Sequence, residues 1–411
     1  MMNMDDVVIH IQGMLEKAKP PISEECCIYK VPLLIRQINQ EAYTPKIVSI
    51  GPYHHNNSHL QNMENHKLTY CKSFLERTNT SMESWIHYIA GKELHIRQCY
   101  LDVLEFSSKE LVEMICVDSG FILELFWITH YKIYDKYLST PWFRLMILYD
   151  LVLLENQLPF FVLHHLFCLS IADGNSDIPS FIRLTFKYFD LFNRLDLKPN
   201  LITTCHHFTD LLRHFHLCGR KQTTRTGQWP HIPSVTKLSE AGIRFGKHES
   251  KCYLNLSFSR KVLKIPRFTV DDGTEILFRN MVALEQFHYP NDAYITEYAL
   301  VLQYLVNTGK DVDILVKAGI LKNFLGDSDS AAERTKRLCR NILLKDFSSD
   351  YVSLWQDLDA SYKSRRLKLK STLRRDYCKS PWQTAATIAA IVVLILSFVQ
   401  TICSIWQIKQ S

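Results

Sequence analysis

The 411 residues are 47% hydrophobic and 12% aromatic, values that exclude a disordered chain and are typical of a globular protein. The chain is long for one hydrophobic core, which predicts two packed units or one large domain with insertions. Its low content of turn-forming residues, 13 Gly and 14 Pro, together with its long apolar runs favours a mainly helical protein. The net charge of +6 is local, because residues 361–379 carry +7 and leave −1 for the remainder, so a nucleic-acid-binding surface is excluded.

Residues 1–25 are predicted to be an N-terminal extension. They have a weakly amphipathic pattern that stops at Pro20-Pro21, and they lack the basic and then apolar order of a secretory signal. The twelve cysteines are irregularly spaced, and a bond between the adjacent Cys26 and Cys27 would be strained. We therefore expect a reduced, cytosolic body with free thiols rather than a disulfide framework.

Residues 26–360 are predicted to form a large, mainly α-helical body. Its early stretch 43–57, YTPKIVSIGPYHHNN, is expected to connect two helices. Gly51 and Pro52 suit a tight turn, and Ser58 with Gln61 forms a capping-box pattern at the start of the next helix.

The most apolar parts of this body are residues 106–130 and 143–168. The second is predicted to be a buried helix pair that breaks at Pro159. Its acidic residues, Asp150 and Glu155, must find partners, because an unpaired buried charge costs several kcal/mol.

The second half of the body is predicted to contain a polar insertion and a small β-hairpin. Residues 219–234 are rich in turn formers and are expected to divide two lobes. Residues 252–270 alternate apolar and polar side chains, which predicts the hairpin, with Pro266 at a sheet edge.

The end of the chain is predicted to cross a membrane. Residues 384–406 form a run of 23 residues without charge, long enough for a helix to span the hydrocarbon core. Trp382 and Trp406 flank the run as interfacial anchors. Residues 361–383 are a basic juxtamembrane segment, and residues 407–411 are a short tail.

The positions of the basic residues predict the orientation of this single-pass membrane protein. Eight basic residues precede the span and are expected to face anionic lipid on its cytoplasmic side: Lys363, Arg365, Arg366, Lys368, Lys370, Arg374, Arg375 and Lys379. The body is then cytoplasmic, at the plasma membrane or an endomembrane. Three glycosylation sequons, at Asn56, Asn79 and Asn255, would be inert there.

Two groups of histidines are candidates for chemistry. His54 and His55 are candidates for a metal site, a general base or turn packing, but no Cys or carboxylate lies nearby at ligand spacing. The stretch 205–218, CHHFTDLLRHFHLC, is rich in ligand types, yet it fits one amphipathic helix and matches no standard zinc spacing. We therefore predict no metal and no cofactor.

Two glutamates are the other catalytic candidates. Glu155 and Glu285 both lie in apolar runs and would suit a pair of acid–base carboxylates, although buried capping or ion pairing is the simpler interpretation. The sequence contains no glycine-rich phosphate loop, nucleophile elbow or zincin motif.

Several long motifs together resemble a plant family. They occur in the family's order between about residues 26 and 406: CCIYKVP, EAYTPKIVSIGPYHH, LQNMENHKLTYCKSFLER, LVLLENQLPFFVL, AGIRF, LFRNMVALEQFHYP and the terminal span. The family is the one catalogued as domain of unknown function 247. The resemblance implies a plant-specific, mostly helical protein with a C-terminal membrane helix and with no established enzymatic activity.

Some grass relatives in that family are associated with self-recognition between pollen and stigma. This role is not attached to particular residues, so it cannot be transferred to positions of this chain. Two hypotheses follow. The first is a membrane-tethered interaction or recognition module whose partners are membrane lipid and another protein. The alternative is a membrane-anchored enzyme that uses Glu155, Glu285 and His54 or His55.

Overall fold

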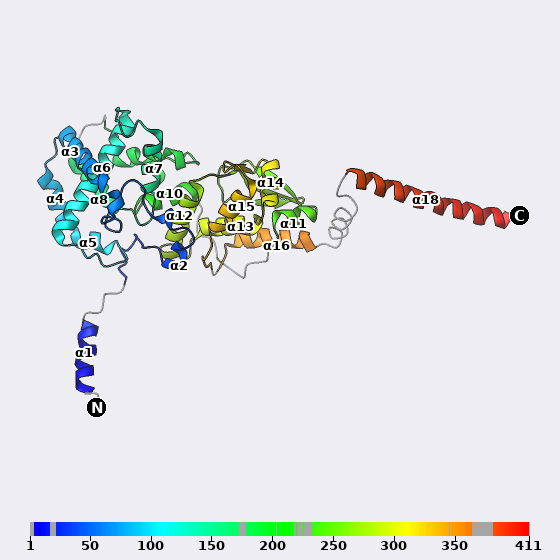
Figure 1. Ribbon diagram of the computed structural model, residues 1–411, viewed down its shortest axis with the longest axis horizontal. Helices are drawn as coiled ribbons and strands as arrows, with labels where there is room; N and C mark the ends of the chain where they lie inside the picture. Colours follow the sequence, from blue (N-terminus) through cyan, green and yellow to red (C-terminus); the bar gives the residue numbers. More distant parts are fainter. Residues whose placement is uncertain are drawn as a thin grey trace. The chain divides into compact units, whose positions relative to one another are not determined.

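The computed structural model describes residues 4–16, 22–171, 178–202, 204–217, 219, 225, 232–344, 346–363 and 381–410. Over these residues the fold is mainly α-helical with a few short strands, which confirms the predicted class (Figure 1). The chain divides into two compact units. Unit 1 contains Met1–His216 and Ile276–Ala293, and unit 2 contains Leu217–Glu275 and Tyr294–Ser411. Most of the predicted divider 219–234 lies outside the described residues.

Unit 1 is built from α-helices and short 3₁₀ helices. In chain order they are α1 (Met4–Glu16), α2 (Leu33–Arg36), η1 (Gln40–Tyr43), η2 (Ser58–Met63), α3 (Glu64–Thr78), α4 (Met82–Gly91), α5 (Glu93–Gln98), α6 (Ser108–Tyr131), α7 (Pro141–Asp150), α8 (Phe160–Ser170), α9 (Phe181–Tyr188), η3 (Asp190–Phe192), η4 (Pro199–Leu201), α10 (Phe208–Leu217) and α12 (Thr274–Phe287). The first two residues of α12 and the last of α10 belong to unit 2.

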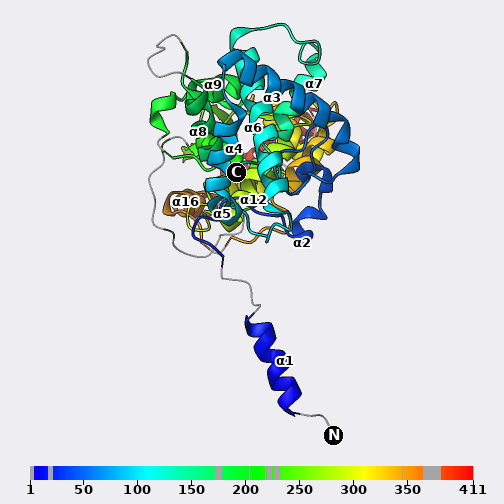
Figure 2. The same cartoon turned by 90° about the vertical axis from the view of Figure 1, so that its left-hand side faces the viewer.

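Helix α6 is the central element of unit 1. It begins with a capping box, in which Ser107 and Glu110 satisfy each other's backbone N–H groups, and ends at Lys132 in a left-handed conformation. It packs against α3, α4, α8 and α9 (Figure 2). Because neighbours cover it on several sides, most of its middle is buried, including Phe121 and Phe126.

The contact between α3 and α6 depends on one glycine. A Cβ atom at Gly120 would lie within 2.7 Å of the Cys71 Cα atom on α3. Real side chains do not tolerate such a distance, so the absence of a side chain at Gly120 allows the two helices to approach closely.

The predicted helix pair of residues 143–168 is present. Helix α7 ends at Asp150, and α8 begins at Phe160 directly after Pro159, whose ring cannot continue a helix from the preceding turn. The connector 43–57 also delivers the chain to a helix, first as η2 and then as α3.

Unit 2 combines helices with short strands. They are α11 (Val235–Glu240), β1 (Arg244–His248), β2 (Ser257–Ser259), β3 (Val262–Pro266), β4 (Phe268–Val270), α13 (Tyr294–Leu305), α14 (Gly309–Lys317), β5 (Leu321–Asn323), α15 (Ser328–Arg337), α16 (Ser349–Lys363) and α18 (Pro381–Gln410). The strands form a sheet of order β1-β3-β2, in which β1 is parallel to β3, and a separate parallel pair, β4 and β5.

The predicted hairpin is confirmed in a shorter form, as β2 and β3. Its two-residue turn places Arg260 and Lys261 at positive φ, the backbone twist that suits a tight hairpin. The edge position expected for Pro266 is wrong. Proline stands at the last residue of the middle strand, where the loss of its N–H interrupts little of the ladder.

The cysteines agree with the expected free thiols at eight described positions: Cys26, Cys27, Cys71, Cys99, Cys116, Cys168, Cys205 and Cys339. The expectation is wrong at Cys252, which is disulfide-bonded. Spacing in the sequence carries no information on such a pairing, because the fold decides which thiols meet.

We predict that Gly120→Ala destabilises unit 1 by about 3 kcal/mol or more, because the added methyl group overpacks the contact between α3 and α6. Chemical denaturation of the full chain measures the change. Gly91→Ala is the matched control, since a Cβ at this helical glycine meets no atom within 4 Å. The control should be neutral or stabilising by up to about 1 kcal/mol. Equal effects from both substitutions would contradict the helix contact.

Candidate functional site

Glu155 and His54 lie together, as the enzyme hypothesis requires, but Glu155 is already in use. One of its oxygens, Oε1, accepts the N–H of Val31 at 2.7 Å. The other, Oε2, lies 2.7 Å from the Arg36 guanidinium and 3.3 Å from Nε2 of His54. The Glu155 side chain is 1% exposed. Glu155 thus fastens the start of the body, at Val31 and Arg36, to the loop after α7.

Asp150 binds the stretch that precedes the two histidines. Its carboxylate accepts the backbone N–H groups of Lys46, Ile47 and Val48 at 2.7–2.9 Å. Burial raises the pKa of Asp150 to about 7, although these three donors lower it. Side-chain oxygens therefore supply the hydrogen bonds that a helix or sheet would give this irregular stretch.

Two further side chains continue this binding. Asn156 accepts the N–H of Ile50 at 2.7 Å, and Asp118 on α6 accepts the N–H of Gly51 at 2.8 Å. Asp118 is also paired with the buried ammonium group of Lys67 on α3. The segment 46–51 is therefore held almost entirely by acidic and amide side chains from α6 and the α7–α8 region.

His55 does not join His54 at Glu155. Its ring packs edge-on against Phe106, with centroids 6.0 Å apart, at the end of the connector. The two histidines thus face different neighbours, which favours turn packing for this pair.

Glu285 is held by a different arginine. Its Oε1 lies 2.9 Å from Nε of Arg213, whose guanidinium stacks on Tyr289 at 3.9 Å. Glu155 is paired with Arg36 instead. Each carboxylate therefore has its own arginine as a counter-charge, an arrangement typical of structural ion pairs rather than of an acid–base pair.

The histidine-rich stretch 205–218 surrounds one buried carboxylate, Asp210. Its oxygens accept the N–H of His206 at 3.0 Å and the hydroxyl of Tyr289 at 2.9 Å, and Nε2 of His214 lies 3.8 Å away. Burial raises the pKa of Asp210, but the neighbouring histidines, His214 first and then His207, lower it. The lowering effects together outweigh burial, so the pKa of Asp210 lies below its usual value. Within the described residues, no group of three or more metal-binding side chains is arranged to hold an ion.

His207 is buried in this cluster as a neutral ring. Its Nε2 donates to the carbonyl of Cys27 at 3.0 Å, and its Nδ1 accepts the N–H of Asp210 at 3.3 Å. A proton on Nδ1 would face the N–H of Asp210 and remove the acceptor of that hydrogen bond. Burial lowers the pKa of His207 to about 4, so the ring has a structural role at neutral pH.

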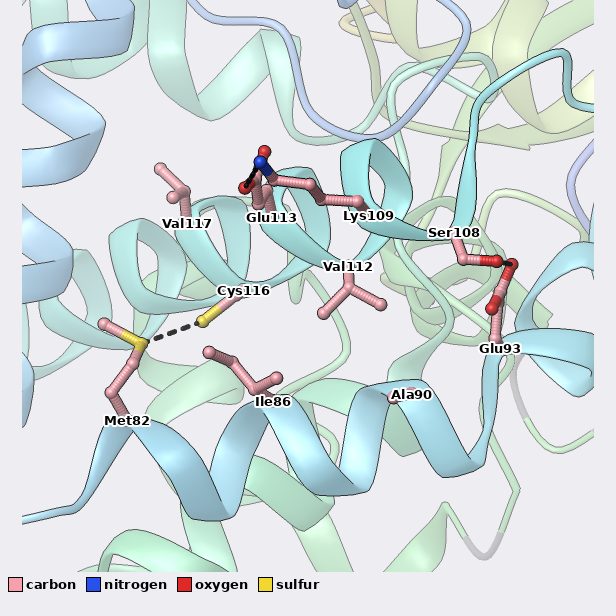
Figure 3. A pocket seen from close by; sticks show the side chains of 10 residues that line it. All are labelled: Met82, Ile86, Ala90, Glu93, Ser108, Lys109, Val112, Glu113, Cys116 and Val117. Atoms are coloured by element: carbon pink, nitrogen blue, oxygen red, sulfur yellow. Dashed lines mark hydrogen bonds and ion pairs between the residues drawn. The ribbon is translucent and has the colours of Figure 1, made fainter.

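An open apolar groove is a different kind of site. It lies between α4 and α6, has a volume of about 500 Å³, and is defined here as the α4–α6 groove. Figure 3 shows side chains of α4 directed toward those of α6 across it. Its apolar lining residues are Met82, Ile86 and Ala90 from α4, and Val112, Cys116 and Val117 from α6.

Polar side chains lie at one end of the α4–α6 groove. There the Ser108 hydroxyl donates to Glu93 at 2.9 Å. At the other end the Cys116 thiol lies 3.4 Å from the Met82 sulfur. The lining of α4 from Met82 to Ala90 corresponds to about 12 Å of helix at 1.5 Å per residue. The groove therefore has the length and lining to take one face of a short amphipathic helix.

Helix α18 contains the predicted membrane span. Residues Thr384–Ile402 are long and apolar enough to cross a bilayer, and none of this stretch is buried. Trp382 is exposed near its start, whereas Trp406 lies in α18 but its side chain is not described. Lys363 ends α16 in an ion pair with Asp359 at 2.7 Å. The other seven basic residues, Arg365, Arg366, Lys368, Lys370, Arg374, Arg375 and Lys379, lie outside the described residues.

Comparison with known proteins places the chain in a family. A family model described as a plant protein of unknown function, domain of unknown function 247, matches residues 28–396. The chain belongs to this family. The domain-247 chain is 28% identical to UPF0481 protein At3g47200 of Arabidopsis thaliana over 418 residues, which cover 93% of the chain and 87% of the relative. No solved structure matches the domain-247 chain.

A second relative supports the same assignment. Putative UPF0481 protein At3g02645 of Arabidopsis thaliana is 22% identical over 472 residues, covering 91% of the domain-247 chain and 89% of the relative. Both matches extend over nearly the whole chain, so the family covers both units and not one unit alone.

Sequence reasoning missed the α4–α6 groove, because it depends on how two helices meet. The only available signal was the apolar spacing of Met82, Ile86 and Ala90, which is indistinguishable from a buried helix face in the sequence.

We predict that His207 makes unit 1 less stable in acid. Between pH 6.5 and about 4 the unfolded chain binds more protons at this ring than the folded chain, so stability falls as pH falls through that window. The shift corresponds to at most about 3 kcal/mol. His207→Gln, which retains a donor for the Cys27 carbonyl, should lose this part of the pH dependence in denaturation curves measured from pH 4 to 7.

The difference between variant and parent isolates this effect, because the raised pKa of Asp150 acts in the opposite direction over the same range. His59→Gln, at an exposed histidine, is the control and should leave the pH dependence as it is. A His207→Gln curve parallel to the parent curve would show that the ring titrates normally.

Proposed function

We propose that the domain-247 chain is a membrane-anchored interaction module. In this proposal α18 anchors the chain in a bilayer, the body lies on the cytoplasmic side, and the α4–α6 groove binds an amphipathic helix of another protein. The observation that carries the proposal is the combination, in one chain, of an unburied apolar span and an open apolar groove.

The anchoring part is supported by the exposure of α18. An apolar surface of this size is unfavourable in water, because each buried CH₂ group contributes roughly 0.8 kcal/mol. A soluble core helix would be covered by its own body, whereas the stretch Thr384–Ile402 is 0% buried. Insertion into a bilayer removes this surface from water.

The orientation is supported by charge and by thiols. Basic residues precede the span, and Lys409 alone follows it, which favours a cytoplasmic body. The thiols of Cys27 and Cys99 interact, as do those of Cys71 and Cys116, and all four are free. Paired free thiols are typical of a reducing compartment, although the bond at Cys252 is a feature more common in oxidising ones.

The binding part is supported by the shape and lining of the α4–α6 groove. A helix laid along two helices buries side chains spaced at i, i+3, i+4 and i+7, and this mode needs an apolar floor with polar rims. The floor is formed by residues such as Ile86 and Val112, and the rim by the pair Lys109 and Glu113, 3.8 Å apart.

Protease protection on microsomes tests the anchored, cytoplasmic arrangement. We expect added protease to degrade the body, the protein to resist alkaline extraction, and Asn56, Asn79 and Asn255 to carry no sugar. An acceptor sequon appended after residue 411 should be glycosylated, which confirms that the tail crosses.

A matched pair of variants controls this experiment. Leu394→Arg with Ile395→Arg adds two charges at the centre of the span, each costing roughly 2.5–3.5 kcal/mol for insertion, and should release the protein on extraction. Leu343→Arg, at an exposed site outside the span, should not. A protected body with sugar at any of the three native sequons would reverse the proposed orientation.

A further inference from the structure

We propose that α1 of the same chain binds in the α4–α6 groove and occupies it until a partner helix replaces it. This inference rests on the proposed function, because it names the chain's own N-terminal helix as an occupant and competitor at that groove. It assigns an inhibitory role to the N-terminal extension.

Helix α1 has the chemistry that the groove requires. Six of its seven apolar residues recur at heptad-like spacing and form one stripe: Met4, Val7, Val8, Ile11, Met14 and Leu15. None of its residues is buried, and Ile11 is 49% exposed. A stripe of this kind is worth little to an isolated helix of 13 residues, which is marginal in water without a surface to cover it.

The chain enters the body beside one end of the groove. Cys27 and Ile28 donate their N–H groups to the carbonyl of Cys99, and Glu25 lies 3.3 Å from His95 on α5. Helix α5 begins at Glu93, which lines the groove. The entry point is thus two residues along α5 from the groove's polar end.

The connection is long enough for α1 to reach the groove, and α1 is long enough to cover it. Residues 17–24 separate α1 from Glu25, and eight residues span up to about 26 Å when extended. Helix α1 is about 20 Å long, so it can cover the whole α4 side of the groove, which is about 12 Å from Met82 to Ala90. Since its C-terminal end is tethered at the Glu93 end, α1 would run parallel to α4, with Met4 toward Met82.

Charge argues against a membrane surface as the place for α1. Interfacial helices carry Lys and Arg on their polar face, because cytoplasmic leaflets are anionic. Within α1 the charged residues are Asp5, Asp6 and Glu16, with no Lys or Arg. An acidic amphipathic helix is better matched to a protein groove.

Site-specific photocrosslinking in the full chain tests this binding. Benzoylphenylalanine replaces Ile11, on the stripe, or Ile9, which lies on the opposite side of α1 and is also exposed. The protein is reconstituted in phosphatidylcholine nanodiscs, irradiated and mapped by mass spectrometry. We expect the crosslinker at position 11 to give about tenfold more adduct with residues 82–117 than the crosslinker at position 9. This ratio corresponds to a bound state of α1 that is populated about ten times more than the unbound state.

A second pair of variants ties the adduct to the groove. Ala90→Lys places a charge on the groove floor and should abolish the Ile11 adduct, whereas His87→Lys, on an exposed part of α4 outside the lining, should leave it unchanged. Both sites are exposed, so both variants should fold, and denaturation curves check this. An adduct to lipid, an adduct at dimer mass, or equal yields from Ile11 and Ile9 would each overturn the inference.

A crosslinker at Ala90 separates this inference from the proposed function. This chain also carries Ile11→Asp, which prevents α1 from binding in the groove, and it is mixed with plant microsomal extract. The proposed function then predicts that the crosslinker at position 90 forms an adduct with an apolar helix of another protein. The further substitution Ile86→Lys should abolish that adduct. If that adduct forms and the Ile11 adduct does not, the function stands and the inference fails. If the Ile11 adduct forms and Ala90 captures no other protein, the groove binds α1 and the proposed partner role fails.

Discussion

Unit 1 depends on buried carboxylates that bind irregular backbone. Asp118, Asp150 and Glu155 accept the N–H groups of the stretches around Val31 and 46–51, which lie far from them in sequence. An unsatisfied buried N–H costs about 1–3 kcal/mol, so these acceptors replace the ladder that a strand would supply. Arginine and lysine neutralise two of these acids, which makes their burial tolerable.

This constraint changes the meaning of the family motifs. Glu155 and Glu285, which look like catalytic candidates, bind Arg36 and Arg213 and so connect distant parts of the chain, and His54 lies beside Glu155. Two surfaces among the described residues are apolar and open to a partner. They are the α4–α6 groove and the span in α18, and the proposed function assigns a binding role to each.

Much of the fold could be predicted from local patterns, and the site could not. Helical spacing, the break at Pro159 and the uncharged run near the C-terminus act over a few residues, so they can be recognised in the sequence. Asp150 was expected to need a partner, but the sequence does not show that its partners are backbone N–H groups about a hundred positions earlier. The groove and the requirement for Gly120 likewise arise only when α3, α4 and α6 meet.

Native-state hydrogen exchange at the backbone amides of Ile47, Val48, Ile50 and Gly51 tests the central claim most directly. These residues lie outside regular helices and strands, so ordinary loop amides would exchange quickly. If the buried carboxylates and Asn156 hold them, their exchange should be as slow as that of the core of α6 and should require unfolding of unit 1. Exchange at the rate of an exposed loop would show that the segment is not bound, and the structural role assigned to these acids would be wrong.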